Sequence, residues 1–335
     1  MTHKTRFILK AVVLMTAVIT LHACKTAEYH KNSGFIFGTS YNITYLNEND
    51  LQKDIDSVLQ KVDYSLSPFN KQSLITAINE NRDTVVDTYM REVFTLAETI
   101  NADTHGAFDI TVAPLVNAWG FGFKNGKMPT DSDIKEICSH VGFNKVRLTD
   151  NHIIKDDTLT MLDCSAIAKG YAVDKVAEML EDRGSKDYMV EIGGEIICKG
   201  MNPQGRQWMV GVIKPEEDSL STNGELQTRL ELTDIAMATS GNYRNFYYKG
   251  GRKYAHTIDP MTGYPVQHNI LSATVLAPTC AMADAYATSF MVLGLDEAKR
   301  ILDRHSDMMA YIIYTDEQGA YSVWYSPAMK EHIEK

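Results

Sequence analysis

The chain has 335 residues with 33 basic and 43 acidic side chains, which gives a net charge of -10. A hydrophobic content of 44%, with nine prolines, 21 glycines and five cysteines, is typical of one or two globular domains and excludes a disordered chain, a collagen-like repeat and a disulfide-stapled mini-protein. The acidic excess also excludes a non-specific nucleic-acid binder, because phosphate affinity comes chiefly from clustered Lys and Arg.

The first 23 residues have the build of an export signal. Three basic residues precede an uncharged run over residues 11–21, which is shorter than the roughly 20 apolar residues that a membrane-spanning helix needs. The run ends in Leu21-His22-Ala23-Cys24, which resembles a bacterial lipobox. We therefore expect residues 1–23 to be a lipoprotein signal peptide and Cys24 to be lipidated. The alternative is ordinary cleavage after Ala23, which would leave Cys24 a plain thiol.

Residues 24–33 are polar and are predicted to form a tether, and a single domain is predicted over residues 34–330. Alternating hydrophobicity predicts a strand at its start, over residues 34–46. Apolar residues spaced three and four apart then predict amphipathic helices, over residues 51–65, about 90–100 and about 134–141.

The second half is rich in Val, Ile, Tyr and Thr, which favours strands. Strands are predicted over residues 145–148, 158–162, 188–192, 208–213, 228–233, 271–277, 308–314 and 321–326, with helices over 166–182, 281–293 and 295–305. Because helices and strands do not alternate regularly, we expect an α+β fold. The expected unit is one compact domain of mixed sheets flanked by helices, with room for a pseudo-twofold division.

The four cysteines outside the signal, Cys138, Cys164, Cys198 and Cys280, form no Cys-x-x-Cys pair and have no histidine at zinc spacing. We expect buried free thiols. A disulfide is the alternative in an oxidising compartment.

Two segments in the first half carry residues suited to binding a ligand. Gly106–Leu115 surrounds Phe108 and Asp109 with small residues, so the backbone could approach a planar ligand and the carboxylate could accept hydrogen bonds from it. Asp163–Ala172 runs into a helix whose N-terminal N–H groups, together with Lys169, suit a phosphate. Each segment also has a structural explanation: a turn with core aromatics for the first, and helix capping with a solvated lysine for the second.

Glu191-Ile192-Gly193-Gly194-Glu195 is a turn signal with weak functional specificity. It lacks the G-x-G-x-x-G spacing of dinucleotide-binding folds, and it lacks the lysine of a phosphate-binding P-loop. Conventional hydride transfer and P-loop chemistry therefore lose support.

Titratable and oxygen-bearing residues follow in two later segments. His256 precedes an Asp259-Pro260 turn and could act as a general base near neutral pH, or could be a histidine with a structural hydrogen bond. Asp284 and Thr288 are four residues apart in a predicted helix, so their oxygens share one face and suit a hard cation such as Mg²⁺. The alternative is a solvated pair, which the apolar neighbours disfavour because a carboxylate among them needs a partner.

In chain order these segments, with Ala238–Arg244, resemble the FAD:protein FMN transferase family, also called ApbE-like flavin transferases, over nearly all of residues 34–330. The resemblance implies an exported, membrane-anchored lipoprotein of the inner membrane, facing the periplasm. It implies Mg²⁺ as cofactor and FAD as substrate, with FMN moved onto a Ser or Thr of an acceptor and AMP released. Implied acceptors are extracytoplasmic flavoproteins and subunits of sodium-pumping or other electron-transfer complexes.

The same resemblance implies roles for single residues. Phe37 and Phe69 stand where relatives often have Met and Tyr as flavin and adenine contacts. Further FAD contacts are implied for Ala107, Phe108, Asp109, Asp163, Lys169 and Ile258. Mg²⁺ ligands are implied at the carbonyls of Ala166 and Ala287 and the side chains of Asp284 and Thr288.

The expected reaction is attack of the acceptor hydroxyl on the FMN-side phosphorus of FAD. His256 is the first candidate for the base, with Asp259 as its orienter or its replacement. Two alternatives stay open: a metal-dependent FAD pyrophosphatase, in which water is the nucleophile, and a non-enzymatic flavin-binding lipoprotein. A magnesium site argues against a mere carrier.

Overall fold

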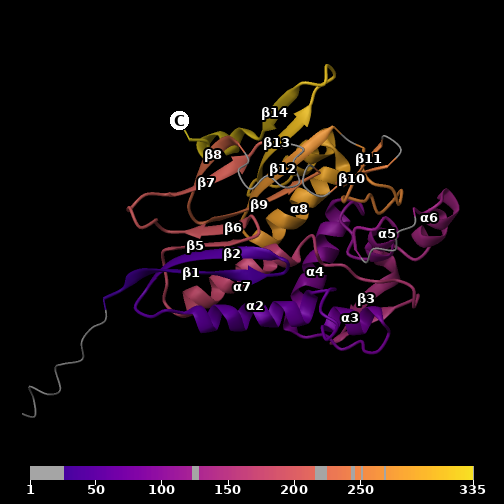
Figure 1. Cartoon of the computed structure of the whole chain (residues 1–335), viewed down its shortest axis with the longest axis horizontal. Coiled ribbons are helices and arrows are strands. Elements are labelled where there is room, and N and C mark those ends of the chain that lie inside the picture. The colour runs from indigo at the N-terminus through magenta and orange to yellow at the C-terminus, as the bar shows by residue number, and fades with distance from the viewer. Residues whose placement is uncertain are drawn as a thin grey trace, which may run out of the picture.

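The structure is a computed structural model that describes residues 26–122, 128–215, 225–242, 246–249, 252–267 and 269–334. Its centre is an eight-stranded antiparallel sheet in the order β1-β2-β5-β6-β9-β12-β13-β14 (Figure 1). The strands are β1 (Glu28–Ile36), β2 (Thr39–Asn47), β5 (Tyr188–Ile192), β6 (Glu195–Lys199), β9 (Ile235–Gly241), β12 (Ile270–Ala277), β13 (Met309–Thr315) and β14 (Tyr321–Tyr325). The first four in this order come from residues 28–199 and the last four from residues 235–325, so the sheet joins the two halves of the chain.

Helices cover one face of this sheet (Figure 1). The long ones are α2 (Gln52–Leu66), α4 (Thr88–Asp103), α7 (Ala168–Asp182) and α8 (Cys280–Leu293). The shorter ones are α3 (Leu74–Asn79), α5 (Ala113–Ala118), α6 (Asp131–Cys138) and α9 (Leu295–Leu302), with 3-10 turns η1 (Phe143–Lys145) and η2 (Pro327–Glu331). Apolar side chains of the long helices and of β2, β5, β9 and β12 form one continuous core, the main hydrophobic contribution to stability.

Three two-stranded ribbons complete the fold: β3 (Val146–Thr149) with β4 (His152–Lys155), β7 (Trp208–Ile213) with β8 (Leu226–Leu232), and β10 (Phe246–Lys249) with β11 (Arg252–Ala255). The β7–β8 ribbon and η2 pack on the other face of the sheet, where they bury Trp208, Val210, Leu230 and Met329 against β6 and β13. No helix among the described parts of the chain is long and apolar enough to cross a membrane.

The expected α+β class is confirmed, and the helix predicted over residues 51–65 is α2, displaced by one residue at each end. The four cysteines are free thiols, and three of them are buried, whereas Cys138 is partly exposed. Burial raises the pKa of Cys164, Cys198 and Cys280, so these thiols stay protonated.

The start of the domain differs from expectation. The strand predicted over residues 34–46 is a hairpin in which β1 pairs with β2, and residues 28–33 of the predicted tether belong to β1. The turn lies at Phe37 and Gly38, which have φ of 53° and 76°. β1 is an edge strand with several exposed residues, so its polar sequence resembles a linker although its backbone is fully paired along β2.

Several short elements were also not predicted: α3, α5, β6, β9, β10 and β11. The strand predicted over residues 158–162 is wrong, because the partner of β3 is β4, which begins at His152. Short elements contain too few hydrophobic repeats to show a period, and packing against the rest of the fold determines their structure.

Helices α7 and α8 cross very closely at Gly170. A Cβ atom there would lie 2.3 Å from the carbonyl oxygen of Cys280 and 2.9 Å from the Cα of Ala281, so only glycine fits. Each helix also accepts hydrogen bonds from the first turn of the other. Asp174 of α7 accepts from the N–H groups of Cys280 (2.7 Å) and Ala281 (2.8 Å), and Asp284 of α8 accepts from the N–H of Gly170 (3.1 Å). These bonds satisfy N-terminal donors that have no partner within their own helix.

The carboxyl of Asp174 should make the stability of the crossing depend on pH. Burial raises its pKa to about 7, although the two N–H donors oppose the shift. Between roughly pH 4 and pH 7 the folded chain therefore binds a proton that the unfolded chain has lost, and the contribution of this group to the free energy of unfolding falls as pH rises.

We expect Asp174→Asn to remove that dependence. Urea unfolding near pH 5 and pH 7.5 should give a difference in unfolding free energy at least about 1 kcal/mol smaller than in the unsubstituted protein, since one pKa unit corresponds to about 1.4 kcal/mol. Asp182→Asn, at an exposed position at the end of the same helix, is the control. If the difference in unfolding free energy between the two pH values were the same in the Asp174→Asn and unsubstituted proteins, the raised pKa of Asp174 would not be the cause of the pH dependence.

Candidate active site

A pocket of about 750 Å³ opens where the two halves of the sheet meet. Its walls come from the loop that follows α4, the start of α7, the β5–β6 turn, β7, β9, the segment after β11, and α8. The pairing of β6 with β9 extends over only three residue pairs, from Cys198–Ile235 to Ile196–Met237. Beyond that point β9 continues through Thr239, Ser240 and Gly241, which line the pocket. A volume of this size falls within the range of small-molecule and cofactor sites.

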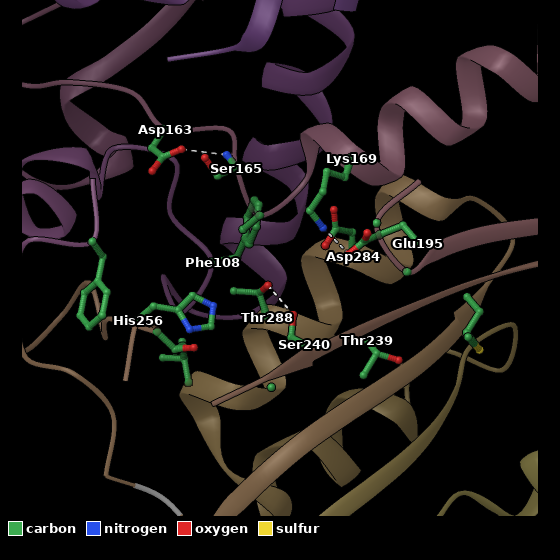
Figure 2. Close-up of a pocket in the computed structure, with 18 of the residues that line it drawn as sticks. Phe108, Asp163, Ser165, Lys169, Glu195, Thr239, Ser240, His256, Asp284 and Thr288 are labelled. Carbon is green, nitrogen blue, oxygen red and sulfur yellow. Dashed lines mark hydrogen bonds and ion pairs between the residues drawn. The ribbon is translucent and has the colours of Figure 1, made fainter. Parts of the chain in front are cut away.

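One wall gathers three charged side chains: Lys169 from the first turn of α7, Glu195 from the first position of β6, and Asp284 from the second turn of α8 (Figure 2). Lys169 Nζ and Glu195 Oε1 form an ion pair. Asp284 is 3% exposed and Glu195 is also 3% exposed. The group therefore places two buried carboxylates around one ammonium at the N-terminus of a helix, where the helix dipole adds positive potential.

These charges shift each other's pKa values. Burial alone would lower the pKa of Lys169, but Asp284 and Glu195 outweigh burial and raise it, so the side chain stays an ammonium. Burial raises the pKa of Glu195, Asp284 adds to the rise, and Lys169 opposes it.

The Gly193-Gly194 turn brings Glu195 to the pocket. Gly193 has φ of 64°, and a Cβ atom on it would lie 2.7 Å from Cγ2 of Thr39 in the neighbouring hairpin. Glu191 supports the same turn by accepting from the N–H of Gly194 (2.8 Å) and from Nδ2 of Asn42 (2.8 Å). The backbone therefore requires glycine here and leaves little freedom in where β6 begins.

A hydroxyl pair and a histidine lie elsewhere around the pocket. Thr288 of α8 and Ser240 of β9 are hydrogen-bonded through their hydroxyls at 2.9 Å. In Figure 2, His256 lies on the opposite side of Phe108 from Lys169, Asp284 and Glu195. His256 directly follows β11 and packs edge-on against Phe121, with ring centroids 6.4 Å apart. The pocket thus has a charged end and an end with an imidazole.

The loop after α4 supplies the apolar surface between these ends. Phe108 is fixed through its backbone, since its carbonyl accepts from Asn101 Nδ2 (2.7 Å) and its N–H donates to Thr104 Oγ1 (3.1 Å). Asp109 is buried, and its oxygens accept from the N–H and hydroxyl of Thr111 and from the N–H of Phe143. Burial raises the pKa of Asp109 against those bonds. In the structure, Asp109 therefore stabilises the loop that carries Phe108.

Asp163 lies just before α7 and ties this region to the loop. Its N–H donates to the carbonyl of Ile110 (2.7 Å), and its Oδ1 accepts from the N–H of Ser165 (2.8 Å). The predicted helix start is close to the observed one, although α7 begins at Ala168 and its preceding residue makes no side-chain cap. Ala166 therefore lies in a turn before the helix.

The structure brings most of the predicted site residues to this one pocket. Lining it are Phe69, Ala107, Phe108, Asp109, Asp163, Ala166, Lys169, His256, Ile258, Asp284 and Thr288. Three predicted residues do not line it. Phe37 lies in the β1–β2 turn, and Ala287 is buried within α8. Asp259 accepts from the N–H of Met261 (2.9 Å) and the hydroxyl of Thr262 (2.8 Å) in its own turn. The functional roles of all these residues stay predictions.

Sequence reasoning assigned no role to several lining residues. The turn signal at residues 191–195 predicts no role for Glu195, although a carboxylate directly before the apolar run Ile196-Ile197-Cys198 is a recognisable signal of a buried charge. The segment Ala238–Arg244 does not indicate that Ser240 pairs with Thr288. Met209, Gly211 and Ile213 alternate along β7 and line the pocket, whereas Trp208 and Val212 belong to the core behind, and Val210 contributes to both. Only the position of the β7–β8 ribbon identifies that wall.

The predicted magnesium ligands include the carboxylate of Asp284, the hydroxyl of Thr288 and the carbonyl of Ala166, which all line the pocket. Such oxygen donors are those that Mg²⁺ prefers. Two observations fit a cation here: the two carboxylates outnumber the one ammonium, and Glu195 Oε2 is buried without a hydrogen-bond partner in the described part of the chain. Within the described residues no three His, Cys, Asp or Glu side chains form a metal cluster, so such a site relies on one carboxylate and neutral oxygens.

Known proteins resemble this chain along most of its length. A model of the ApbE family matches residues 37–313. The chain is 36% identical over 329 residues to the FAD:protein FMN transferase of Haemophilus influenzae, covering 92% of this chain and 94% of the relative. It is 35% identical over 336 residues to the protein of the same name from Vibrio cholerae, covering 97% and 99%.

Solved structures resemble the fold as well. The flavin transferase ApbE from Vibrio cholerae superposes with a TM-score of 0.82 at 34% identity, covering 91% of this chain and 99% of that one. The flavinyl transferase ApbE of Pseudomonas stutzeri, in its apo form, has a TM-score of 0.80 at 29% identity and covers 91% and 97%.

Proposed function

We infer from the fact that the chain belongs to the ApbE family that the pocket is the catalytic site of a flavin transferase. The protein is an FAD:protein FMN transferase, which moves FMN from FAD to a Ser or Thr hydroxyl of an acceptor protein and releases AMP. The observation that carries this assignment is the arrangement within one pocket of Lys169 and Asp284 at one end and His256 beyond Phe108, with Thr288 lining the same pocket.

The charged end is suited to the diphosphate of FAD. Lys169 contributes an ammonium at the N-terminus of α7, and the dipole of this 15-residue helix favours an anion there. Phe108 and Ile258 contribute apolar surface on which a planar ring can pack, and Phe69, which is 67% exposed, lies at the rim. Asp163 and the Ala107 backbone add polar groups beside them.

Asp284, Thr288 and the carbonyl of Ala166 would hold Mg²⁺, with Ala287 one residue before Thr288 in the same helix turn. When bound, the ion would neutralise charge that develops on the diphosphate as AMP leaves, an effect worth several kcal/mol. Asp284 is fixed for this role by the N–H of Gly170, and Thr288 is oriented by the hydroxyl of Ser240.

The reaction requires one bond exchange and one proton transfer. The acceptor oxygen bonds to the FMN-side phosphorus, the bridging oxygen leaves with AMP, and the proton of the hydroxyl passes to a base. We assign that proton to a ring nitrogen of His256, an imidazole that lines the same pocket and can bind a proton near neutral pH. Asp259 stabilises the turn that follows His256 and so fixes Ile258 and Pro260, the residues after the base.

Asp284→Ala should abolish flavin transfer while the fold persists. We expect covalent flavin on an acceptor, seen as fluorescence in a denaturing gel and as added FMN mass, to fall at least about 100-fold, because the metal loses its single carboxylate. Asp296→Ala in α9, whose side chain is 90% exposed, should transfer normally. Undiminished labelling by Asp284→Ala would refute the metal assignment. AMP release by the unsubstituted protein without labelling would instead indicate a pyrophosphatase.

His256→Gln should slow the chemical step without weakening FAD binding. Loss of a general base typically costs about 10²- to 10⁴-fold in rate. Single-turnover transfer at saturating FAD and acceptor measures the rate, and quenching of flavin fluorescence measures affinity, which should change less than about twofold. A transfer rate within about threefold of the unsubstituted protein would assign the proton to another group.

Export and anchoring are proposed from the first 24 residues, which lie outside the described residues. A protein lipidated on Cys24 faces the periplasm from the inner membrane, where it would meet acceptor subunits of sodium-pumping and related electron-transfer complexes. Cys24→Ser should move the protein from the membrane pellet to the soluble fraction, whereas Cys138→Ser should not. Membrane retention of Cys24→Ser would contradict the lipid anchor.

A further inference from the structure

Glu195 is a buried carboxylate whose two oxygens have different surroundings. Oε1 forms the ion pair with Lys169, while Oε2 is buried and has no hydrogen-bond partner among the residues that the structure describes. The side chain is almost completely buried and lines the pocket. A buried carboxylate oxygen without a hydrogen-bond partner lowers the stability of the folded protein. The presence of Glu195 at this position is therefore better explained by a role in the pocket than by a contribution to stability.

The position of Glu195 contrasts with that of Glu191 in the same turn. Both oxygens of Glu191 accept hydrogen bonds, from Gly194 and from Asn42, so Glu191 stabilises the turn itself. The side chain of Glu195 instead contacts Lys169, a residue 26 positions earlier in another element. Of these two pocket-lining carboxylates, only Glu195 contacts the lysine.

Lys169 has two carboxylates within electrostatic reach, and they contact different groups. The lysine is paired with Glu195, whereas Asp284 accepts from the N–H of Gly170 and interacts with the lysine only through its charge. If Lys169 were paired with Asp284, each would neutralise the other. The ammonium would then be less available to an anion and the carboxylate less available to a cation.

We propose that Glu195 is a positioning residue that holds the ammonium of Lys169 away from Asp284, so that the lysine is kept for the diphosphate of FAD and the aspartate for a cation. The inference rests on the proposed function, because it concerns the same pocket. It assigns to the Gly-Gly-Glu turn the task of separating two opposite charges that would otherwise pair.

This proposal and a simple charge effect predict opposite changes in FAD affinity. Removing a carboxylate from the pocket makes its potential more positive, which by itself tightens binding of an anionic ligand. If Glu195 positions Lys169, its removal lets the lysine pair with Asp284, and FAD binding weakens. The sign of the change therefore separates positioning from charge.

The test measures FAD affinity of the purified protein by flavin fluorescence, with a chelator present so that no metal contributes. We expect Glu195→Gln to weaken binding roughly tenfold, the loss typical of one hydrogen bond to a charged group. Asp182→Asn removes a negative charge from the exposed end of the helix that carries Lys169, outside the pocket, and should bind FAD as tightly as the unsubstituted protein. Unchanged or tighter binding by Glu195→Gln would overturn the proposal.

A double-mutant cycle with Lys169→Met shows whether Glu195 acts through the lysine. In the Lys169→Met background, adding Glu195→Gln should change FAD affinity less than about twofold, because there is no ammonium left to position. An additional tenfold loss in that background would overturn the proposal. Glu195→Asp, which retains the charge, should recover part of the affinity, and it replaces Glu195→Gln in the cycle if thermal melting shows that the glutamine variant is unfolded.

Failure of this inference is distinguishable from failure of the proposed function. Independent effects of the two substitutions on FAD binding, together with normal transfer to an acceptor, would reject the role of Glu195 alone. Coupled effects on FAD binding without any transfer of FMN would support the role of Glu195 and reject the transferase assignment.

Discussion

The site depends on the close crossing of α7 and α8. Gly170 lets the two backbones approach to a distance that no side chain permits, and carboxylates of each helix accept hydrogen bonds from the first turn of the other. The same crossing places Lys169 and Asp284 on one wall of the pocket, because each lies within one residue or one turn of the contact. Packing and chemistry therefore use the same few positions, and the helices cannot shift without moving the charges.

An acidic chain must create positive potential locally in order to bind an anionic dinucleotide. The net charge of -10 makes long-range attraction of such a ligand unfavourable. In the proposed function this potential comes from one ammonium at a helix N-terminus and from the cation that Asp284 and Thr288 would hold. Positive charge is thus placed where the diphosphate would lie, although the chain as a whole is acidic.

The fold class, the long helices and most of the residues of the pocket can be predicted from the sequence, because long apolar periods and ordered motifs are recognisable without knowledge of the tertiary structure. It was insufficient where the neighbouring chain decides the structure. The polar sequence of β1 resembles a linker because β1 is an edge strand. The face of β7 that packs on the sheet cannot be distinguished from the opposite face until the position of the ribbon is known. The sequence around Glu195 predicts only a turn, because its partner Lys169 is distant in sequence and belongs to another element.

The short pairing between β6 and β9 means that the pocket lies at a seam between the two halves of the sheet. A ligand that contacts Lys169 from the first half and Thr288 from the second would act as a cross-link between them. Its binding energy would then add to the cohesion of the whole domain, as linkage requires for any ligand that binds only the folded chain. Substrate supply would in this way govern how long the protein survives heat or proteolysis, so that an enzyme without FAD is also a more fragile one.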